Sequence, residues 1–232
     1  ECGVCGVFGS PEAATRAYLV LYALQHRGQE SAGIASADGD LIPFHKGKGL
    51  VADIFSEEVL SRLHGHLAIG HVRYSTAGSS ELKNAQPFVV DFESGSIAVA
   101  HNGNLVNADV LRKRLEVEGS IFQSTMDTEV IVHLIARSRG ERIEDRIVDA
   151  LSQVRGAYSL LFMTRDKLSA VRDPHGIRPL VLGKVKGGYV VCSETCALDL
   201  IEGECVREVD PGEMIVIGDR GIFATKPFTP AR

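Results

Sequence analysis

The sequence has 232 residues, a formal net charge of −5, five cysteines and no tryptophan. This length suits one large domain or two small ones, and it is enough for a substantial core. The negative charge and the lack of a basic stripe argue against nucleic acid or an anionic membrane as a partner. No apolar run approaches the roughly 20 residues that span a bilayer, and the start lacks a signal peptide's pattern. An odd, sparse set of cysteines indicates a reducing, cytoplasmic location.

In the amino-terminal half, the pattern predicts short strands and amphipathic helices. The apolar run after Cys2 is typical of a buried strand, and Ser10-Pro11-Glu12 predicts a helix start with Ser10 as the cap. Asn107 is expected to cap a later helix that Gly119 closes. The further elements expected here are a first helix ending near 25, a hairpin of 33–37 and 41–45, a helix over 56–63, strands over 67–74 and 96–100, and helices over 108–119, 128–138 and 143–153.

From residue 157 onward the pattern changes to strands separated by turns. The strands expected are 158–164, 167–172, 180–184, 188–192, 205–209, 214–218 and 222–225. Strands, then helices, then strands again favour an α+β fold with antiparallel sheets covered by helices, rather than a parallel βαβ series.

A cysteine stands one bond from the amino terminus. If Cys2 were the first residue, its α-amino group would have a pKa of about 7.7–8.0. Such an amine can take the thiol proton and return it to a leaving amine. As printed, Glu1 blocks that amine, so either Glu1 is the last residue of a leader that is removed or this chain cannot do the chemistry. The alternative is a strand in which Cys2 and Cys5 are small buried hydrophobes.

Polar residues that follow predicted strands are the other candidates for chemistry. His101-Asn102-Gly103-Asn104 comes directly after a buried strand. Asn-Gly is a strong turn signal. Alternatively, the Asn102 amide and the Gly103 N–H form an oxyanion hole, in which one donor is worth about 2.7–4 kcal/mol of barrier.

Two charged residues suit the two ends of an amino acid. Arg73 ends a strand beside a hydroxyl-rich loop, where it is either a solvated strand end or a fork that grips a carboxylate with Thr76 near it. Asp127 precedes a helix, where it is either the cap or the acceptor of a substrate ammonium. The spacing alone does not show that Arg73 and Asp127 meet.

The cysteine spacing gives little support to a metal or disulfide site. Cys2-x-x-Cys5 and Cys192-x-x-x-Cys196 are the only clustered thiols, and neither spacing suits a closed four-ligand zinc site. The redox motif also lacks its strand–helix context.

Taken in order, these stretches resemble the class II glutaminase domain of the glutamine phosphoribosylpyrophosphate amidotransferase family. The matching stretches, which extend over essentially the whole chain, are 2–4, 24–33, 70–78, 101–105, 127–129, 173–180, 193–197 and 211–213. The resemblance implies an N-terminal-nucleophile hydrolase fold, a four-layer αββα sandwich of two antiparallel sheets. It also implies that residues 1–232 are one glutaminase domain.

The resemblance assigns the site residues one by one. Cys2 is implied as the nucleophile with its own α-amine as the base, and Arg27 as a residue that orders the site. Asn102 and Gly103 are implied as the oxyanion hole. The residues implied to bind glutamine are Arg73 at the carboxylate and Asp127 at the ammonium, with Thr76 and His101 beside them.

The resemblance implies that in members of this family the ammonia passes to a phosphoribosyltransferase domain. There it converts phosphoribosyl pyrophosphate to phosphoribosylamine, which is the first step of purine synthesis. The paired acids and Gly/Thr-rich loop of that domain are absent from this sequence. Mg²⁺ and, in some members, a 4Fe–4S cluster belong to the full-length protein, which is expected to be a homo-oligomer; no cofactor is expected in this chain. Two alternatives stay open: an inert glutamine-binding domain with Glu1 retained, or the glutaminase domain of another class II amidotransferase.

Overall fold

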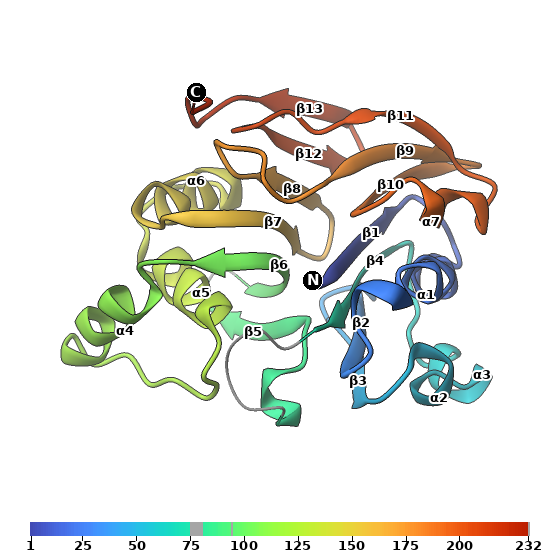
Figure 1. The fold of residues 1–232 in the computed structure, drawn as a ribbon, viewed down its shortest axis with the longest axis horizontal. Coiled ribbons are helices and arrows are strands. Elements are labelled where there is room, and N and C mark those ends of the chain that lie inside the picture. Colours follow the sequence, from blue (N-terminus) through green and yellow to red (C-terminus); the bar gives the residue numbers. More distant parts are fainter. Residues whose placement is uncertain (75–80, 94, 232) are drawn as a thin grey trace.

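The computed structural model describes residues 1–74, 81–93 and 95–231, which form two antiparallel sheets with helices on their outer sides (Figure 1). In spatial order, the strands of the first sheet are β11 (Glu204–Glu208), β9 (Val181–Val185), β10 (Gly188–Cys192), β1 (Gly3–Phe8), β4 (Leu67–Arg73), β2 (Ser31–Ser36) and β3 (Phe44–Lys48). Those of the second sheet are β13 (Gly221–Thr225), β12 (Met214–Gly218), β8 (Leu168–Arg172), β7 (Gly156–Met163), β6 (Gly95–Leu105) and β5 (Phe88–Phe92). All strand pairs are antiparallel, as expected for an α+β fold.

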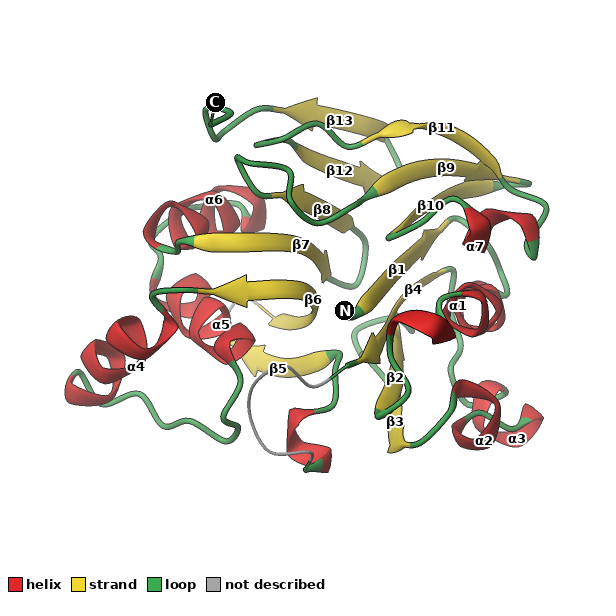
Figure 2. Cartoon of the chain, in the orientation of Figure 1, coloured by secondary structure: helices red, strands yellow, loops and turns green. Residues whose placement is uncertain are grey.

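The helices form two outer layers, one on each sheet (Figure 2). On the side of the first sheet lie α1 (Ala13–Ala23), α2 (Val51–Ile54), α3 (Glu57–Leu60) and α7 (Cys196–Asp199). On the side of the second sheet lie α4 (Ala108–Val117), α5 (Asp127–Arg137) and α6 (Ile143–Gln153). Each layer has its own apolar cluster against its sheet; Ala17, Leu21 and Leu24 are fully buried in the first, as the helical spacing predicts. The αββα layer order is therefore confirmed.

A third apolar cluster fills the space between the two sheets. Its members alternate along the strands, as with Val4 and Phe8 on β1, Leu67 and Ile69 on β4, and Ala98 and Ala100 on β6. Because successive side chains of a strand point to opposite faces, the residues between these face the helices instead. This alternation decides which polar residues meet at the ends of the strands.

The structure corrects several predicted boundaries. The first helix begins at Ala13 with Glu12 at its cap position, while Ser10 only accepts a hydrogen bond from the Glu12 N–H. Asn107 does not cap α4 with its side chain, because that amide is bonded to the backbone around residues 153–155. The short helix α2 and the strand β5 were not expected, since neither has a clear period in the sequence.

The turn interpretation of residues 101–104 is wrong. These residues continue β6, which pairs with β7 through Leu105. Pairing with a long neighbouring strand therefore overrides the local preference of Asn-Gly for a turn. Among the described residues, no helix has the length and apolar character needed to cross a membrane.

Candidate active site

Cys2 lies just before β1, next to the amino terminus, which Figure 1 marks between the two sheets. We call this end of the space between the sheets the open end. Its side chain is partly exposed, and its Sγ lies 3.5 Å from the backbone nitrogen of Tyr74, the residue after β4. It lines a pocket of about 340 Å³. The other candidate residues on the wall of that pocket are Arg73, His101, Gly103 and Asp127. The pocket thus brings together residues from both sheets and from the start of α5.

Strand alternation explains why these polar groups share one space. Counting two residues from Val4 on β1 reaches Cys2, and counting in twos from Ile69 on β4 reaches Arg73. On β6, counting two residues from the inward-facing Ala100 reaches Asn102. The three side chains therefore extend the inner faces of the two sheets past the apolar core. Asn102 is almost fully buried, and its Nδ2 has no hydrogen-bond partner among the described residues.

The edge of β6 supplies a free backbone donor. β5 pairs with β6 only at residues 95–99, so no strand of the described part of the chain lies beside the edge of residues 101–105 that faces away from β7. In antiparallel strands, alternate residues direct their N–H to the same edge. There the His101 N–H donates to Gln86 Oε1 at 2.7 Å, and the Leu105 N–H donates to Asp127 Oδ2 at 3.0 Å. The Gly103 N–H lies between them and has no partner among the described residues.

Gly103 cannot be replaced without moving the backbone. An added Cβ would lie 2.0 Å from the carbonyl oxygen of Ala157 on β7 and 2.7 Å from His101 Nε2. Only glycine allows this close approach of β6 and β7 beside the pocket.

Two opposite charges lie on the pocket wall. Arg73 is buried, and its guanidinium lies 3.4 Å from Glu30 Oε1. Asp127 lies 3.4 Å from His101 Nδ1. Burial opposes the charge of Asp127, but the His101 ring and the N–H groups of Leu105 and Thr128 outweigh it, so its pKa is lower than usual. The pocket therefore offers a cation and an anion at different points.

The thiol of Cys2 is held in its protonated form. Burial raises its pKa above the usual value, although the hydrogen bond with Tyr74 and the charge of Arg73 act in the opposite sense. Since the thiolate is the nucleophile, a thiol of raised pKa needs a base close to it.

Arg27 fixes the backbone at Cys2. The side chain is buried, and its Nε donates to the Cys2 carbonyl oxygen at 2.8 Å. Its guanidinium also bonds to Glu194 and lies 3.0 Å from Glu1 Oε2. Glu194 is in turn 3.0 Å from His26 Nε2. Arg27 therefore connects the start of the chain to the loop after β10.

With this geometry in view, the comparisons with known proteins identify the family. A family model described as a glutamine amidotransferase domain matches residues 71–200, which is more than half of the chain. The chain belongs to this family.

The amidotransferase domain is also similar to longer proteins. It is 57% identical over 224 residues to amidophosphoribosyltransferase 2, chloroplastic, of Arabidopsis thaliana, covering 96% of this chain and 40% of the relative. It is 49% identical over 223 residues to the amidophosphoribosyltransferase of Bacillus subtilis, covering 96% of this chain and 47% of that protein. The chain thus spans less than half of the length of these relatives.

A solved structure agrees with the fold. The glutamine phosphoribosylpyrophosphate amidotransferase from B. subtilis, solved with ADP and GMP, superposes with a TM-score of 0.93 at 46% identity, covering 98% of this chain and 49% of that one. The expected resemblance to the glutaminase region of this enzyme family is confirmed.

Thr76 and His101 are two further candidate residues. Thr76 lies outside the residues that the structure describes. His101 is buried in the wall of the pocket, and its Nδ1 lies 3.1 Å from Thr128 Oγ1 and contacts Asp127. It is placed to orient that carboxylate.

The sequence patterns did not predict the roles of four polar residues of the amidotransferase domain. Gln86 and His71 hold the backbone of β6, Glu194 holds Arg27, and Glu129 holds the loop before α5. The position of His71, two residues before Arg73 on a strand, was a usable signal because it predicts the same face. Gln86 and Glu194 gave no such signal, since their partners are distant in the sequence.

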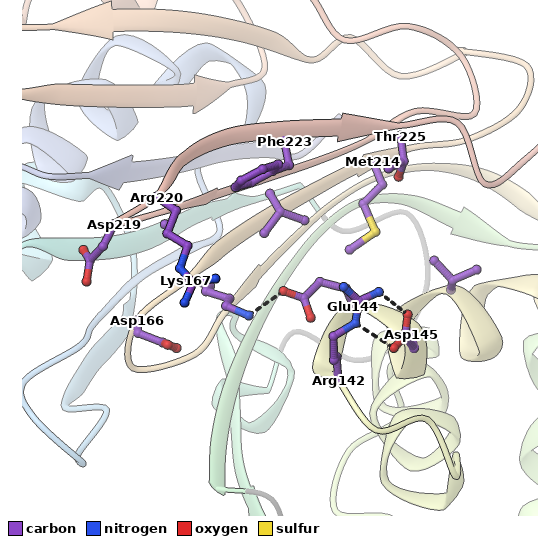
Figure 3. Close-up of a pocket in the computed structure, with 13 residues that line it drawn as sticks. Arg142, Glu144, Asp145, Asp166, Lys167, Met214, Asp219, Arg220, Phe223 and Thr225 are labelled. Atoms are coloured by element: carbon purple, nitrogen blue, oxygen red, sulfur yellow. Dashed lines mark hydrogen bonds and ion pairs between the residues drawn. The ribbon is translucent and has the colours of Figure 1, made fainter.

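A larger cavity of about 870 Å³ lies between α6 and the pair β12–β13 (Figure 3). Two of its basic side chains are neutralised by acids: Lys167 lies 2.6 Å from Glu144, and Arg142 bonds to Asp145. Among the described residues that line it, there is no cysteine, histidine or serine. The smaller pocket at Cys2 is therefore the candidate active site.

In the described part of the chain, no group of three or more His, Cys, Asp or Glu residues is placed to hold a metal ion. The cysteines are all free thiols.

Proposed function

We propose that this amidotransferase domain hydrolyses glutamine to glutamate and ammonia, with Cys2 as the nucleophile. One observation carries the proposal. A thiol, the Gly103 backbone N–H, which has no partner among the described residues, and the opposite charges of Arg73 and Asp127 share a single pocket of about 340 Å³. Such a pocket suits an amide substrate that also carries a carboxylate and an ammonium group.

In the proposed reaction, the Cys2 sulfur attacks the side-chain amide carbon of glutamine, and the carbonyl oxygen becomes an oxyanion. The Gly103 N–H and the Asn102 side chain donate to that oxyanion. The α-amine of Cys2 takes the thiol proton and gives it to the nitrogen of the breaking C–N bond, so that ammonia leaves. Water then hydrolyses the glutamyl thioester, which releases glutamate and restores the thiol.

The charged groups set the orientation of glutamine. The Arg73 guanidinium receives the α-carboxylate, since its planar fork matches that group. The Asp127 carboxylate receives the α-ammonium, and His101 orients Asp127. We assign Thr76 to the carboxylate side as well, and Arg27 to the ordering of the Cys2 backbone.

The ammonia is proposed to serve the synthesis of phosphoribosylamine from phosphoribosyl pyrophosphate, the first step of purine synthesis. Support comes from the relatives, which are amidophosphoribosyltransferases and are about twice the length of this chain. The acceptor reaction, its Mg²⁺, any 4Fe–4S cluster and homo-oligomer formation would belong to the full-length cytoplasmic protein. A path of low water content would keep the ammonia neutral on its way to the acceptor.

The amino terminus gives the sharpest test. The mechanism needs a free amine on Cys2, so we propose that Glu1 is removed. Two matched chains, one that begins at Glu1 and one that begins at Cys2, are checked by mass spectrometry and assayed for glutamate release. We expect activity only in the chain that begins at Cys2. Equal activity in both chains would contradict the role of the amine, and inactivity in both would contradict the proposed hydrolysis.

A further inference from the structure

Two side chains bond to the part of β6 that β5 does not pair with. Beyond residue 99, no described strand pairs with β6 on the edge that faces away from β7. The N–H of His101 on this edge donates to Gln86 Oε1 at 2.7 Å, and its carbonyl oxygen lies 3.0 Å from His71 Nε2. Both backbone groups of the residue two positions before Gly103 are therefore held by side chains.

His71 reaches across from the first sheet. It lies on β4, two residues before Arg73, and its ring is fully buried. A carbonyl oxygen can only accept, so Nε2 of His71 carries the hydrogen. Burial lowers the pKa of His71 to about 3, so the ring stays neutral with one donor at physiological pH. Its Nδ1 has no hydrogen-bond partner among the described residues, which leaves the contact to His101 as its only one there.

Gln86 is fixed to the first sheet as well. The residue is 5% exposed, and its backbone carbonyl oxygen packs on β2 so closely that a Cβ added at Gly33 would lie 2.2 Å from that oxygen. The first sheet also carries Cys2 and Arg73. Through His71 and Gln86, the edge of β6 in the second sheet is therefore tied to the sheet that holds the nucleophile.

We propose that His71 and Gln86 are positioning residues that set the distance from the Gly103 N–H to the Cys2 sulfur. His71 is not among the residues that line the pocket; Gln86 does line it, but its Oε1 accepts from the His101 N–H. Each residue holds the His101 peptide, from which the Gly103 donor follows. This inference rests on the proposed glutamine hydrolysis. The donor is needed only once the oxyanion forms, so loss of position should slow the chemical step and leave glutamine binding intact.

The test compares donor-deleting and donor-keeping variants in the chain that begins at Cys2. His71→Leu and Gln86→Met remove the hydrogen bonds, whereas His71→Gln keeps an N–H donor and Gln86→Glu keeps an oxygen acceptor. We expect His71→Leu and Gln86→Met to lower kcat by about tenfold to a hundredfold, with KM for glutamine within about twofold of the parent, because a misplaced group of this kind costs up to about a hundredfold. His71→Gln should recover most of the loss.

A second readout separates positioning from general damage to the fold. The Cys2 thiol adds to the aldehyde carbon of a glutamine aldehyde analogue, forming a C–S bond, and the thiol proton goes to the former carbonyl oxygen. That oxygen of the hemithioacetal then occupies the oxyanion hole. Affinity for this analogue should fall in parallel with kcat, while affinity for the product glutamate should stay the same. A merely structural role would weaken both ligands. Circular dichroism identifies variants that fail to fold, and if His71→Leu is one of them, Gln86→Met decides.

Three outcomes would overturn the inference. The first is a kcat within about twofold of the parent in folded His71→Leu or Gln86→Met. The second is a raised KM with unchanged kcat, which would make these residues part of glutamine binding. The third is an equal loss of affinity for the aldehyde and for glutamate. An inactive parent chain would refute the proposed function and this inference together, whereas an active parent with unaffected variants would refute this inference alone.

Discussion

The space between the two sheets has two ends that differ in chemistry, although the same strands form both. At the closed end, the inner faces of the strands carry apolar side chains. These are Phe8 on β1, Leu67 on β4, Ala98 on β6 and Met163 on β7. At the open end, the same faces carry Cys2 and Arg73, which line the pocket, and the buried Asn102. The scaffold is continuous, and the site begins where β6 extends beyond its neighbour β5.

This difference shows how a sheet edge can become an active site. At the closed end, neighbouring strands use the backbone donors of β6, so no N–H remains for a ligand. At the open end, side chains hold the flanking peptides, and the Gly103 N–H between them has no partner in the described part of the chain. Substitutions at Cys2, Gly103 and Arg73 should therefore affect the reaction, whereas substitutions at the closed end or in the supporting elements should affect stability.

The largest expected effect separates Cys2 from Cys5, which lie three residues apart. Cys5 is fully buried against α1, with its thiol 3.7 Å from the Ala17 carbonyl oxygen. We expect Cys2→Ser to abolish glutamine hydrolysis and leave the free energy of unfolding unchanged. Cys5→Ala should keep the activity and lower the free energy of unfolding by about 1 kcal/mol, since it leaves a small cavity. Activity assays and urea unfolding measure both; a fully active Cys2→Ser would refute the assignment of the nucleophile.

The next contrast is between two glycines, at which an added Cβ would meet different kinds of neighbour. At Gly103, an added Cβ would meet backbone on β7, whereas at Gly6 it would lie 2.8 Å from the flexible Leu168 side chain. Gly103→Ala should lower kcat by about 10²–10³, because it displaces an oxyanion donor. Gly6→Ala should cost about 1–3 kcal/mol of stability from overpacking and leave kcat unchanged. Similar kcat values in the two variants would contradict the special role of the open end.

A smaller, selective effect is expected at Arg73. Arg73→Lys keeps the positive charge but loses the planar fork that can grip a carboxylate twice. We expect KM for glutamine to rise by about tenfold to a hundredfold, equivalent to the roughly 1.5–3 kcal/mol of a hydrogen bond to a charged group. Initial-rate kinetics would measure it. A glutamine KM equal to that of the parent would remove Arg73 from the substrate contacts.

The smallest effect is a pH dependence of stability at Glu129. Burial opposes its charge, but the His133 ring and donors from Gln123 and Ser124 outweigh burial, so its pKa falls from 4.5 to about 2. A lowered pKa stabilises the fold above pH 4.5, and this contribution is lost as the pH falls toward 2.

Glu129→Gln should therefore be less stable than the parent at pH 7, with a difference that shrinks between pH 4.5 and 2. The control Glu116→Gln, at an exposed position on α4, should match the parent throughout. Urea unfolding at several pH values measures this; a difference independent of pH would contradict the assignment.

Much of the fold and of the candidate site could be predicted from the sequence, because periodicity and motifs are local signals. Periodicity gave most strands and helices, and motifs in order gave the resemblance to a glutaminase. Alternation on each strand also makes Cys2 and Arg73 inward-facing once the fold is known.

The remaining features depend on contacts between distant segments. The sequence could not show that β6 continues through Asn102-Gly103, because that depends on the length of β7. Nor could it pair His71 with the His101 carbonyl oxygen, since the two lie on different sheets. Asp127 is the first residue of α5 rather than its cap, and its carboxylate bonds to Leu105 on a neighbouring strand.

We propose that glutamine is cleaved by the Cys2 sulfur at the open end of the space between the sheets. The most direct measurement is to quench the enzyme in acid while it turns over labelled glutamine, and then to map the label by peptide mass spectrometry. We expect a glutamyl group on the amino-terminal peptide, attached to the sulfur of Cys2. Label on Cys5 or another cysteine, or steady turnover with no labelled thiol, would contradict the account.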